Sequence, residues 1–158
     1  MSTGLIVALT FGIGFVGGLR SMTAPAVVAW AAHLGWINLA GSPLAFMGSR
    51  WALVMWMVFA LGEFVADLLP KTPARTAAMP LTVRTVIGLL TGGCLAVAAG
   101  MALWLGALNG GLGAMAGAFG GYHARAGLVR AFRVPDFVIA IPEDLVAVGL
   151  GLFLVSRF

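Results

Sequence analysis

Charged residues are scarce in this sequence. Of its 158 residues, only 9% are charged and 61% are hydrophobic, and the mean hydropathy is +1.07. Soluble domains carry about 25% charged and about 45–50% apolar residues. A chain this apolar cannot hide its surface in one water-soluble core. The composition therefore excludes an ordinary soluble protein and predicts a single integral membrane domain over residues 1–158.

Cysteine is almost absent as well. Cys94 is the only cysteine, so an internal disulfide and a paired-cysteine metal site are excluded. The sequence also lacks zinc-site spacing, a phosphate-binding loop and a nucleophile elbow. These absences favour a protein that is not an enzyme and has no cofactor. Its basic residues lie at segment ends and not in an aromatic-rich patch, so nucleic acid is not an expected partner.

Long apolar runs dominate what is present. A bilayer core is crossed by about 20 apolar residues, and five stretches are long enough: 4–33, which is interrupted by "RSMTAP", 51–69, 83–107, 109–128 and 136–156. We therefore predict an all-α membrane protein with about five transmembrane helices and the lipid bilayer as its partner. With five spans, six basic residues lie on the side of the N-terminus (Lys71, Arg75, Arg84, Arg125, Arg130 and Arg133) and two lie opposite (Arg50 and Arg157). Basic residues favour the cytoplasmic side, which predicts a bacterial inner-membrane protein with a cytoplasmic N-terminus.

Glycines recur four residues apart in three of these stretches, as in Gly14 and Gly18, Gly88 and Gly92, and Gly113, Gly117 and Gly121. Small residues at this spacing let helix backbones approach closely within lipid. The spacing predicts either tight packing inside one chain or a homodimer through glycine-rich faces.

A faint internal repeat links the two ends of the chain. "GFVGGLRS" at 14–21 resembles "GAFGGYHA" at 117–124, and "VFALGEFVA" at 58–66 resembles "VIAIPEDLVA" at 138–147. Spans 1–2 and 4–5 would then be related by an inverted repeat around span 3. This arrangement is typical of secondary transporters, whose sites lie at broken helices near the membrane centre. Pro25 and Pro142 are the predicted breaks.

Four of the five acidic residues fall inside predicted spans, and the fifth, Asp136, is the first residue of the last span. An acid at the bilayer centre costs on the order of 2.5–3.5 kcal/mol by insertion scales, and such residues usually mark an ion or substrate pathway. Glu63 and Asp67 share a helix face because they are four residues apart. We therefore predict an ion- or solute-binding site in which His123 or Arg20 carries a proton or balances charge. The predicted site residues are Glu63, Asp67, Glu143, Asp144, His123 and Arg20.

Two further interpretations concern the ligand. Oxygen ligands from Glu63, Asp67 and Glu143 would suit a divalent cation such as Mg²⁺, Ca²⁺ or Mn²⁺. Basic residues near the loop ends would contact an anion or a lipid headgroup; they are Lys71, Arg75, Arg84 and Arg125.

The alternative to transport is a structural or accessory membrane protein. In that case the buried acids form salt bridges with arginines and fix the helix register, for example Arg20 with Glu63 or with Glu143.

Four segments carry a resemblance to a known family. They are "GLRSMTAPAVVAWAAHLGW", "GEFVADLLPKTPART", "GAFGGYHARAGLV" and "PEDLVAVG". Together they resemble small bacterial inner-membrane proteins that carry domain of unknown function 4126, and the likeness extends over almost the whole chain. The resemblance implies a membrane location and no particular chemistry.

Overall fold

The computed structural model describes residues 1–67 and 76–158, which form α-helices and no β-strand. The helices are α1 (Thr3–Leu19), α2 (Thr23–His33), α3 (Arg50–Asp67), α4 (Ala78–Ala98), α5 (Leu103–Phe132) and α6 (Asp136–Val155), with a short 3-10 helix, η1 (Ala45–Gly48), before α3. The prediction of an all-α protein is confirmed for these residues. Helices α3 and α6 correspond to the predicted spans 51–69 and 136–156. Each begins and ends within two residues of its predicted bounds.

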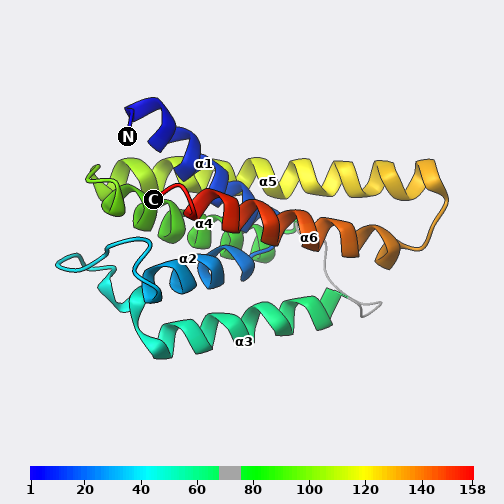
Figure 1. Cartoon of the computed structure of the whole chain (residues 1–158). Helices are drawn as coiled ribbons and strands as arrows, with labels where there is room; N and C mark the ends of the chain where they lie inside the picture. The colour runs from blue at the N-terminus through cyan, green and yellow to red at the C-terminus, as the bar shows by residue number, and fades with distance from the viewer. Residues whose placement is uncertain (68–75) are drawn as a thin grey trace.

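The first predicted span is a helical hairpin and not one crossing (Figure 1). Helix α1 runs parallel to α5, because Gly14 approaches Gly110 while Gly18 approaches Gly117. Helix α2 runs back antiparallel to α3, since Met22 meets Glu63 and His33 meets Gly48. The hairpin turns at residues 20–22, in the middle of the molecule.

The bundle has two chemically different ends. Both chain termini and the α2–α3 and α4–α5 connections lie at one end, and the α5–α6 connection lies at the other (Figure 1). We call the first the tryptophan end, because exposed Trp36, Trp51 and Trp104 lie in or beside its connections. We call the second the arginine end, because Arg130 and Arg133 flank the α5–α6 connection. Arg50 and Arg157 lie at the tryptophan end as well.

Two helices among the described residues are long and apolar enough to cross a membrane, Ala78–Ala98 and Val138–Val155, and Thr3–Leu19 is a shorter apolar helix. They are compatible with a membrane protein. They do not confirm the predicted number of five spans. The hairpin explains part of the discrepancy, because residues 4–33 form two short helices that begin and end at the same end of the bundle instead of one long helix.

Glycine faces pack helices α1, α4 and α5 together. A Cβ added to Gly14 or Gly18 of α1 would overlap backbone atoms of α5, and one added to Gly88 or Gly92 of α4 would do the same. These three helices make the most extensive contacts in the molecule. The predicted close packing is therefore seen inside one chain, and a homodimer through the same faces stays a prediction.

The connection between the third and fourth spans was predicted in the wrong place. The spans 83–107 and 109–128 place it at residue 108, as a very short connection within "LGALNGGLG". The structure instead ends α4 at Ala98, turns through Gly100 with a positive φ of 72°, and starts α5 at Leu103. Asn109 lies inside α5 and donates hydrogen bonds to Val7 O and Thr10 Oγ1 of α1. The glycines of this stretch serve helix contact and not chain reversal.

The two halves of the predicted repeat have different shapes. The first half contains the hairpin, whereas α5 continues unbroken past Gly120 and His123 to Phe132. Pro142 is also not a break, because α6 continues through it. Pro25 lies in the first turn of α2, where its missing N–H costs no helical bond, and the break falls before it. The predicted inverted repeat is not visible in the fold.

The hairpin predicts which ends of the chain share a side of the membrane. On a Cys94→Ser background, we expect Ser2→Cys and Ser156→Cys to react with a membrane-impermeant maleimide from one side. We expect Arg130→Cys, at the arginine end, to react only from the other side. The measurement is maleimide labelling in sealed vesicles of both orientations. If Ser2→Cys and Arg130→Cys are labelled from the same side of the membrane, the hairpin is refuted.

Candidate functional site

The site is the tip of the α1–α2 hairpin, where two helix ends meet inside the protein. Helix α1 ends at Leu19 and α2 begins at Thr23. Arg20 and Ser21, which lie between them, are buried. Helix ends leave backbone N–H and C=O groups without intrahelical partners, and such groups are costly to bury unless they are paired. Side chains from other helices must therefore pair with them.

Glu63 of α3 binds the start of α2. Its Oε1 accepts hydrogen bonds from Ser21 N (2.9 Å) and Ser21 Oγ (2.6 Å), and its Oε2 accepts one from Met22 N (2.8 Å). A carboxylate at a helix N-terminus is favoured by the helix dipole as well as by these charge-assisted bonds. The Glu63 carboxylate thus takes the place that a bound anion would take at such a helix end.

Arg84 of α4 binds the end of α1. Its Nη1 donates to the carbonyl oxygens of Gly18 and Leu19, both at 3.0 Å. Its Nη2 lies 3.5 Å from Glu63 Oε1. A cation at a helix C-terminus is favoured by the dipole. Arg84 and Glu63 therefore stabilise the two opposed helix ends and neutralise each other.

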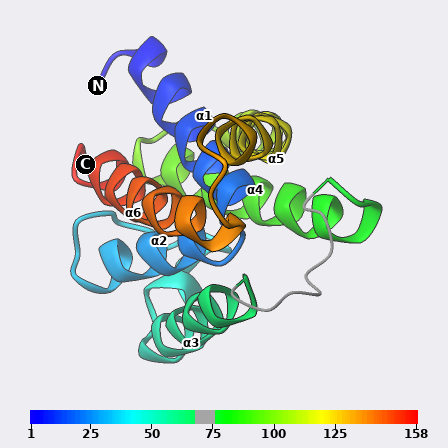
Figure 2. The same cartoon turned by 90° about the vertical axis from the view of Figure 1, so that its right-hand side faces the viewer.

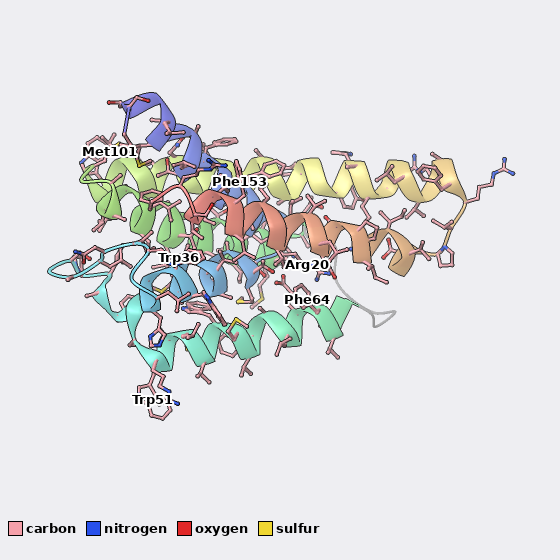
Figure 3. The ribbon with its side chains drawn as sticks, in the orientation of Figure 1. Arg20, Trp36, Trp51, Phe64, Met101 and Phe153 are labelled. Carbon is pink, nitrogen blue, oxygen red and sulfur yellow. The ribbon has the colours of Figure 1, made fainter. Side chains whose placement is uncertain are left out.

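Arg20, at the tip itself, pairs with the last helix. Its guanidinium forms an ion pair with Asp144 of α6 and is almost completely buried, with 1% of its side chain exposed. The same guanidinium lies 5.1 Å from the ring centroid of Phe64, a distance within the range of a cation–π contact. In Figure 3, Arg20 and Phe64 lie next to each other between the hairpin tip and α3. The tip is therefore tied to α3, α4 and α6 at once.

A second charged cluster lies closer to the arginine end. Arg125 of α5 pairs with Asp136 and with Glu143 of α6, the latter at 3.4 Å. Asp136 is 63% exposed, whereas the Glu143 and Arg125 side chains are 12% and 13% exposed. This cluster joins the long α5 to α6.

The structure places four of the six predicted site residues in these two clusters. Glu63, Arg20 and Asp144 meet the hairpin tip, as does Arg84, which we had predicted as an anion or lipid contact. Glu143 instead pairs with Arg125, so Glu63 and Glu143 each pair with a different arginine. Arginine–acid pairs were predicted, and among the described side chains the acid that pairs with Arg20 is Asp144, where we had suggested Glu63 or Glu143. Adjacent acids point in different directions on a helix, and the sequence did not show which one faces Arg20.

His123, which we predicted as a site residue, belongs to neither cluster. Its side chain is exposed on α5, and its ring stacks edge-to-face with that of Tyr122 at 5.3 Å. Gly121, two positions earlier on the same helix, is buried. His123 is therefore separate from the tip in this structure.

Three predicted contacts fall outside the described part of the chain. They are Lys71, Arg75 and the side chain of Asp67. Among the side chains that are described, no group of three His, Cys, Asp or Glu residues is placed to hold a metal ion. The divalent-cation set, which includes Asp67, stays a prediction.

Sequence reasoning missed the backbone donors of the tip. The backbone N–H groups of Ser21 and Met22 donate hydrogen bonds to Glu63. Every residue except proline has such a group, so the sequence does not show which of them form a site. The signal available was Ser21 within "RSMTAP", because serine favours helix starts. Its partner Glu63 is 42 positions away, and no local pattern identifies a partner at that distance.

Comparison with known proteins identifies one relationship. The model of a family described as a domain of unknown function, DUF4126, matches residues 7–156. No curated protein and no solved structure matches the chain.

Proposed function

This chain belongs to the DUF4126 family, and from that premise and the geometry of the tip we propose that it moves a small ion or solute across a membrane. The observation that carries the proposal is the tip itself. Two opposed helix ends meet there beside a carboxylate and an arginine from two further helices. Secondary transporters bind substrates and coupling ions at broken helices of this kind.

The physical argument concerns the cost of the break. An unbroken helix would satisfy its own backbone, whereas this break requires Glu63 and Arg84 to be buried among apolar helices. Charged side chains in such a position are expensive and usually serve a pathway. We propose that the carboxylate of Glu63 exchanges between α2 and a transported cation or proton. Neutralising Glu63 would weaken its bonds to Ser21 and Met22 and would release the start of α2.

The proposed location is the bacterial inner membrane, with an orientation that differs from our first expectation. Basic residues at membrane boundaries favour the cytoplasm, and Arg125, Arg130 and Arg133 belong to the arginine end. Because α1 and α2 double back, the N-terminus lies at the opposite, tryptophan end (Figure 1). The positive-inside rule thus predicts an arginine end in the cytoplasm and both termini outside.

A structural role is the second candidate, and one observation favours it. Glu63, Asp136, Glu143 and Asp144 each form an ion pair with an arginine. Such pairs would hold the helices in register without any exchange of ligand. The chain would then support a partner protein or a lipid assembly.

A flux assay separates the two candidates. Purified protein is reconstituted in liposomes, and uptake of protons, monovalent cations, divalent cations and small anions is followed with ion-sensitive dyes. We expect wild-type protein to move one of these ions and Glu63→Gln to lose at least about 90% of that flux, because the exchanging charge is gone. Asp136→Asn is the matched control, since it removes an ion-paired but exposed acid, and it should retain the flux.

Thermal unfolding of the same samples completes this experiment. A ligand that binds the folded state raises the unfolding midpoint in a concentration-dependent way. If folded wild-type protein moves none of the ions, and Glu63→Gln is less stable without losing any ligand response, transport is refuted in favour of the structural role.

A further inference from the structure

The start of α2 has the groups of an anion-binding site, and the anion that occupies it is a side chain of the protein itself. The Glu63 carboxylate accepts hydrogen bonds from Ser21 N, Ser21 Oγ and Met22 N, and it lies 3.5 Å from Arg84 Nη2. Backbone N–H groups at a helix N-terminus bind phosphates and carboxylates. In this protein a serine hydroxyl and a buried guanidinium add to them, so the site is more than a helix end.

Another donor lies at the same helix start. Thr23, which follows Met22, is 2% exposed, and its Oγ1 has no hydrogen-bond partner among the described residues. The first N–H groups of a helix also lack intrahelical acceptors, and buried donors without acceptors cost free energy. The Glu63 carboxylate therefore satisfies only part of the donors at this helix start.

The donors and the carboxylate belong to differently packed parts of the molecule. Helices α1 and α4, which end at the tip and carry Arg84, are packed against α5 through glycine faces. Helix α3, which carries Glu63, packs mainly on α2 and contacts α6 only sparsely. Figure 2 shows α3 at one edge of the bundle, with α2 between it and α6. A movement of α3 or of its side chain would remove the carboxylate and leave Arg84 in place.

Protonation of Glu63 would favour this movement. It removes the negative charge from the acceptor, and charge-assisted hydrogen bonds are roughly twice as strong as neutral ones. An apolar cavity of about 320 Å³ lies beside the tip, and Thr23 of α2 and Ala60 and Phe64 of α3 line it. A neutral carboxyl group is much less costly in such surroundings than a charged one. The cavity thus gives the neutral side chain a place to move to.

The charge balance of the tip sets the charge of a replacing ion. Among the described side chains, the other charged groups around Glu63 are Arg84 of α4 and the Arg20–Asp144 pair, which joins the tip to α6. The 3-10 helix η1 has no charged residue, and the histidine of α2, His33, is at the far end of that helix. A proton on Glu63 raises the charge of this group by one unit, and one monovalent anion restores it.

The hydrogen bonds of the carboxylate define the shape of the ion. One oxygen of Glu63 accepts from Ser21 and the other accepts from Met22. A halide has a single acceptor atom and cannot occupy both positions, whereas two oxygens of a small planar ion can. A divalent phosphate would bring more negative charge than one proton balances. These requirements fit a small monovalent oxyanion, of the class of formate, nitrate and bicarbonate.

We propose that the tip binds one small monovalent oxyanion in place of the Glu63 carboxylate, and that one proton on Glu63 accompanies each anion. The proton comes from water, is held as a neutral carboxylic acid while the anion is bound, and returns to water when the carboxylate replaces the anion. This inference rests on the proposed function and deepens it, because it assigns the ion to a chemical class.

Thermal unfolding in the presence of nitrate tests the coupling of anion and proton. Full-length protein in detergent is titrated with sodium nitrate at about pH 5 and about pH 8, and sodium gluconate at equal ionic strength serves as a carboxylate too large for the site. We expect nitrate, at ten times its dissociation constant, to raise the midpoint by about 3–6 °C. Wild-type protein should bind nitrate at least about 10-fold more tightly at the lower pH, because one coupled proton changes an affinity by up to tenfold per pH unit. Glu63→Gln should bind nitrate equally at both pH values.

Further variants assign the effect to the tip. Ser21→Ala removes one donor and should weaken nitrate binding by at least about 10-fold, which is the effect of one hydrogen bond to a charged group. Ser42→Ala, in the connection between α2 and α3, is the matched control and should leave binding unchanged. A double variant, His33→Gln with His123→Gln, should keep the pH dependence of the wild type, because neither histidine belongs to the tip.

The inference is overturned if wild-type protein does not respond to nitrate, if its affinity is the same at both pH values, or if Glu63→Gln keeps the pH dependence. These are binding measurements, so their outcome is separate from that of the flux assay. A protein that moves cations but does not bind nitrate would sustain the proposed transport and overturn the anion class. A protein that shows pH-dependent nitrate binding and no flux would sustain the anion site and overturn transport.

Discussion

Replacing Arg84 with alanine is expected to lower the thermal unfolding midpoint by about 10 °C, because removing one member of a buried pair costs about 3–5 kcal/mol and a domain of this size loses about 2–4 °C per kcal/mol. The substitution leaves the carbonyl oxygens of Gly18 and Leu19 without their Arg84 donor and Glu63 without its cation. The measurement is the unfolding midpoint of detergent-purified protein, followed by tryptophan fluorescence.

Two controls show whether the position or the charge matters. Arg130→Ala removes an exposed arginine from α5 and should shift the midpoint by less than about 2 °C. Arg84→Lys keeps the charge but cannot reach both carbonyls and Glu63 with one planar group, so it should fall between wild type and Arg84→Ala. A midpoint for Arg84→Ala close to that of Arg130→Ala would contradict the proposed role of Arg84.

Gly110→Ala is expected to destabilise the protein by at least about 2 kcal/mol, within the range for overpacking a tight contact. A Cβ at Gly110 would overlap the carbonyl oxygen of Gly88 and lie 2.8 Å from Gly92 Cα. Both neighbours are backbone atoms of α4, so the two helices must separate. The unfolding midpoint and the fraction of monodisperse protein on gel filtration should both fall.

Gly127→Ala is the matched control, because Gly127 lies in the same helix and an added Cβ would meet nothing within 4 Å. Both substitutions gain up to about 1 kcal/mol of helix propensity, so the difference between them measures packing alone. Gly127→Ala should be neutral or slightly stabilising. Equal midpoints for the two variants would show that α4 and α5 do not approach as closely as described.

The fold was partly predictable because some helix ends have local causes. Helix α3 begins beside Arg50 and Trp51, and α6 begins after Pro135, and these residues mark boundaries in the sequence itself. The α4–α5 connection was misplaced because the division into spans was based on apolar length, whereas Asn109 and Gly110 lie in a helix that is fixed by packing against α1 and α4. Apolar length is a local quantity, whereas the close approach of Gly110 to Gly88 depends on the tertiary structure.

The sequence predicted several residues of the site but not how they are arranged in space. An acidic residue within a long apolar stretch is visible in the sequence, so Glu63 and Asp144 could be selected as site residues. The reversal at residues 20–22 was not predictable, because an interrupted apolar stretch is compatible with either a kinked crossing or a hairpin. The choice between a kinked crossing and a hairpin depends on contacts with residues far away in the sequence. Arg84, for example, binds Gly18 O from 66 positions away.

The hairpin also imposes an order on biogenesis. Arg20 is synthesised 124 residues before its partner Asp144, which is a delay of roughly 6–25 s at a translation rate of about 5–20 residues per second. During that interval an arginine near the middle of the first apolar stretch has no counter-ion from α6. The ion pair that ties the hairpin tip to α6 therefore forms only after the last helix has been made. A nascent chain that stalls before α6 would lack this tie between its first and last helices.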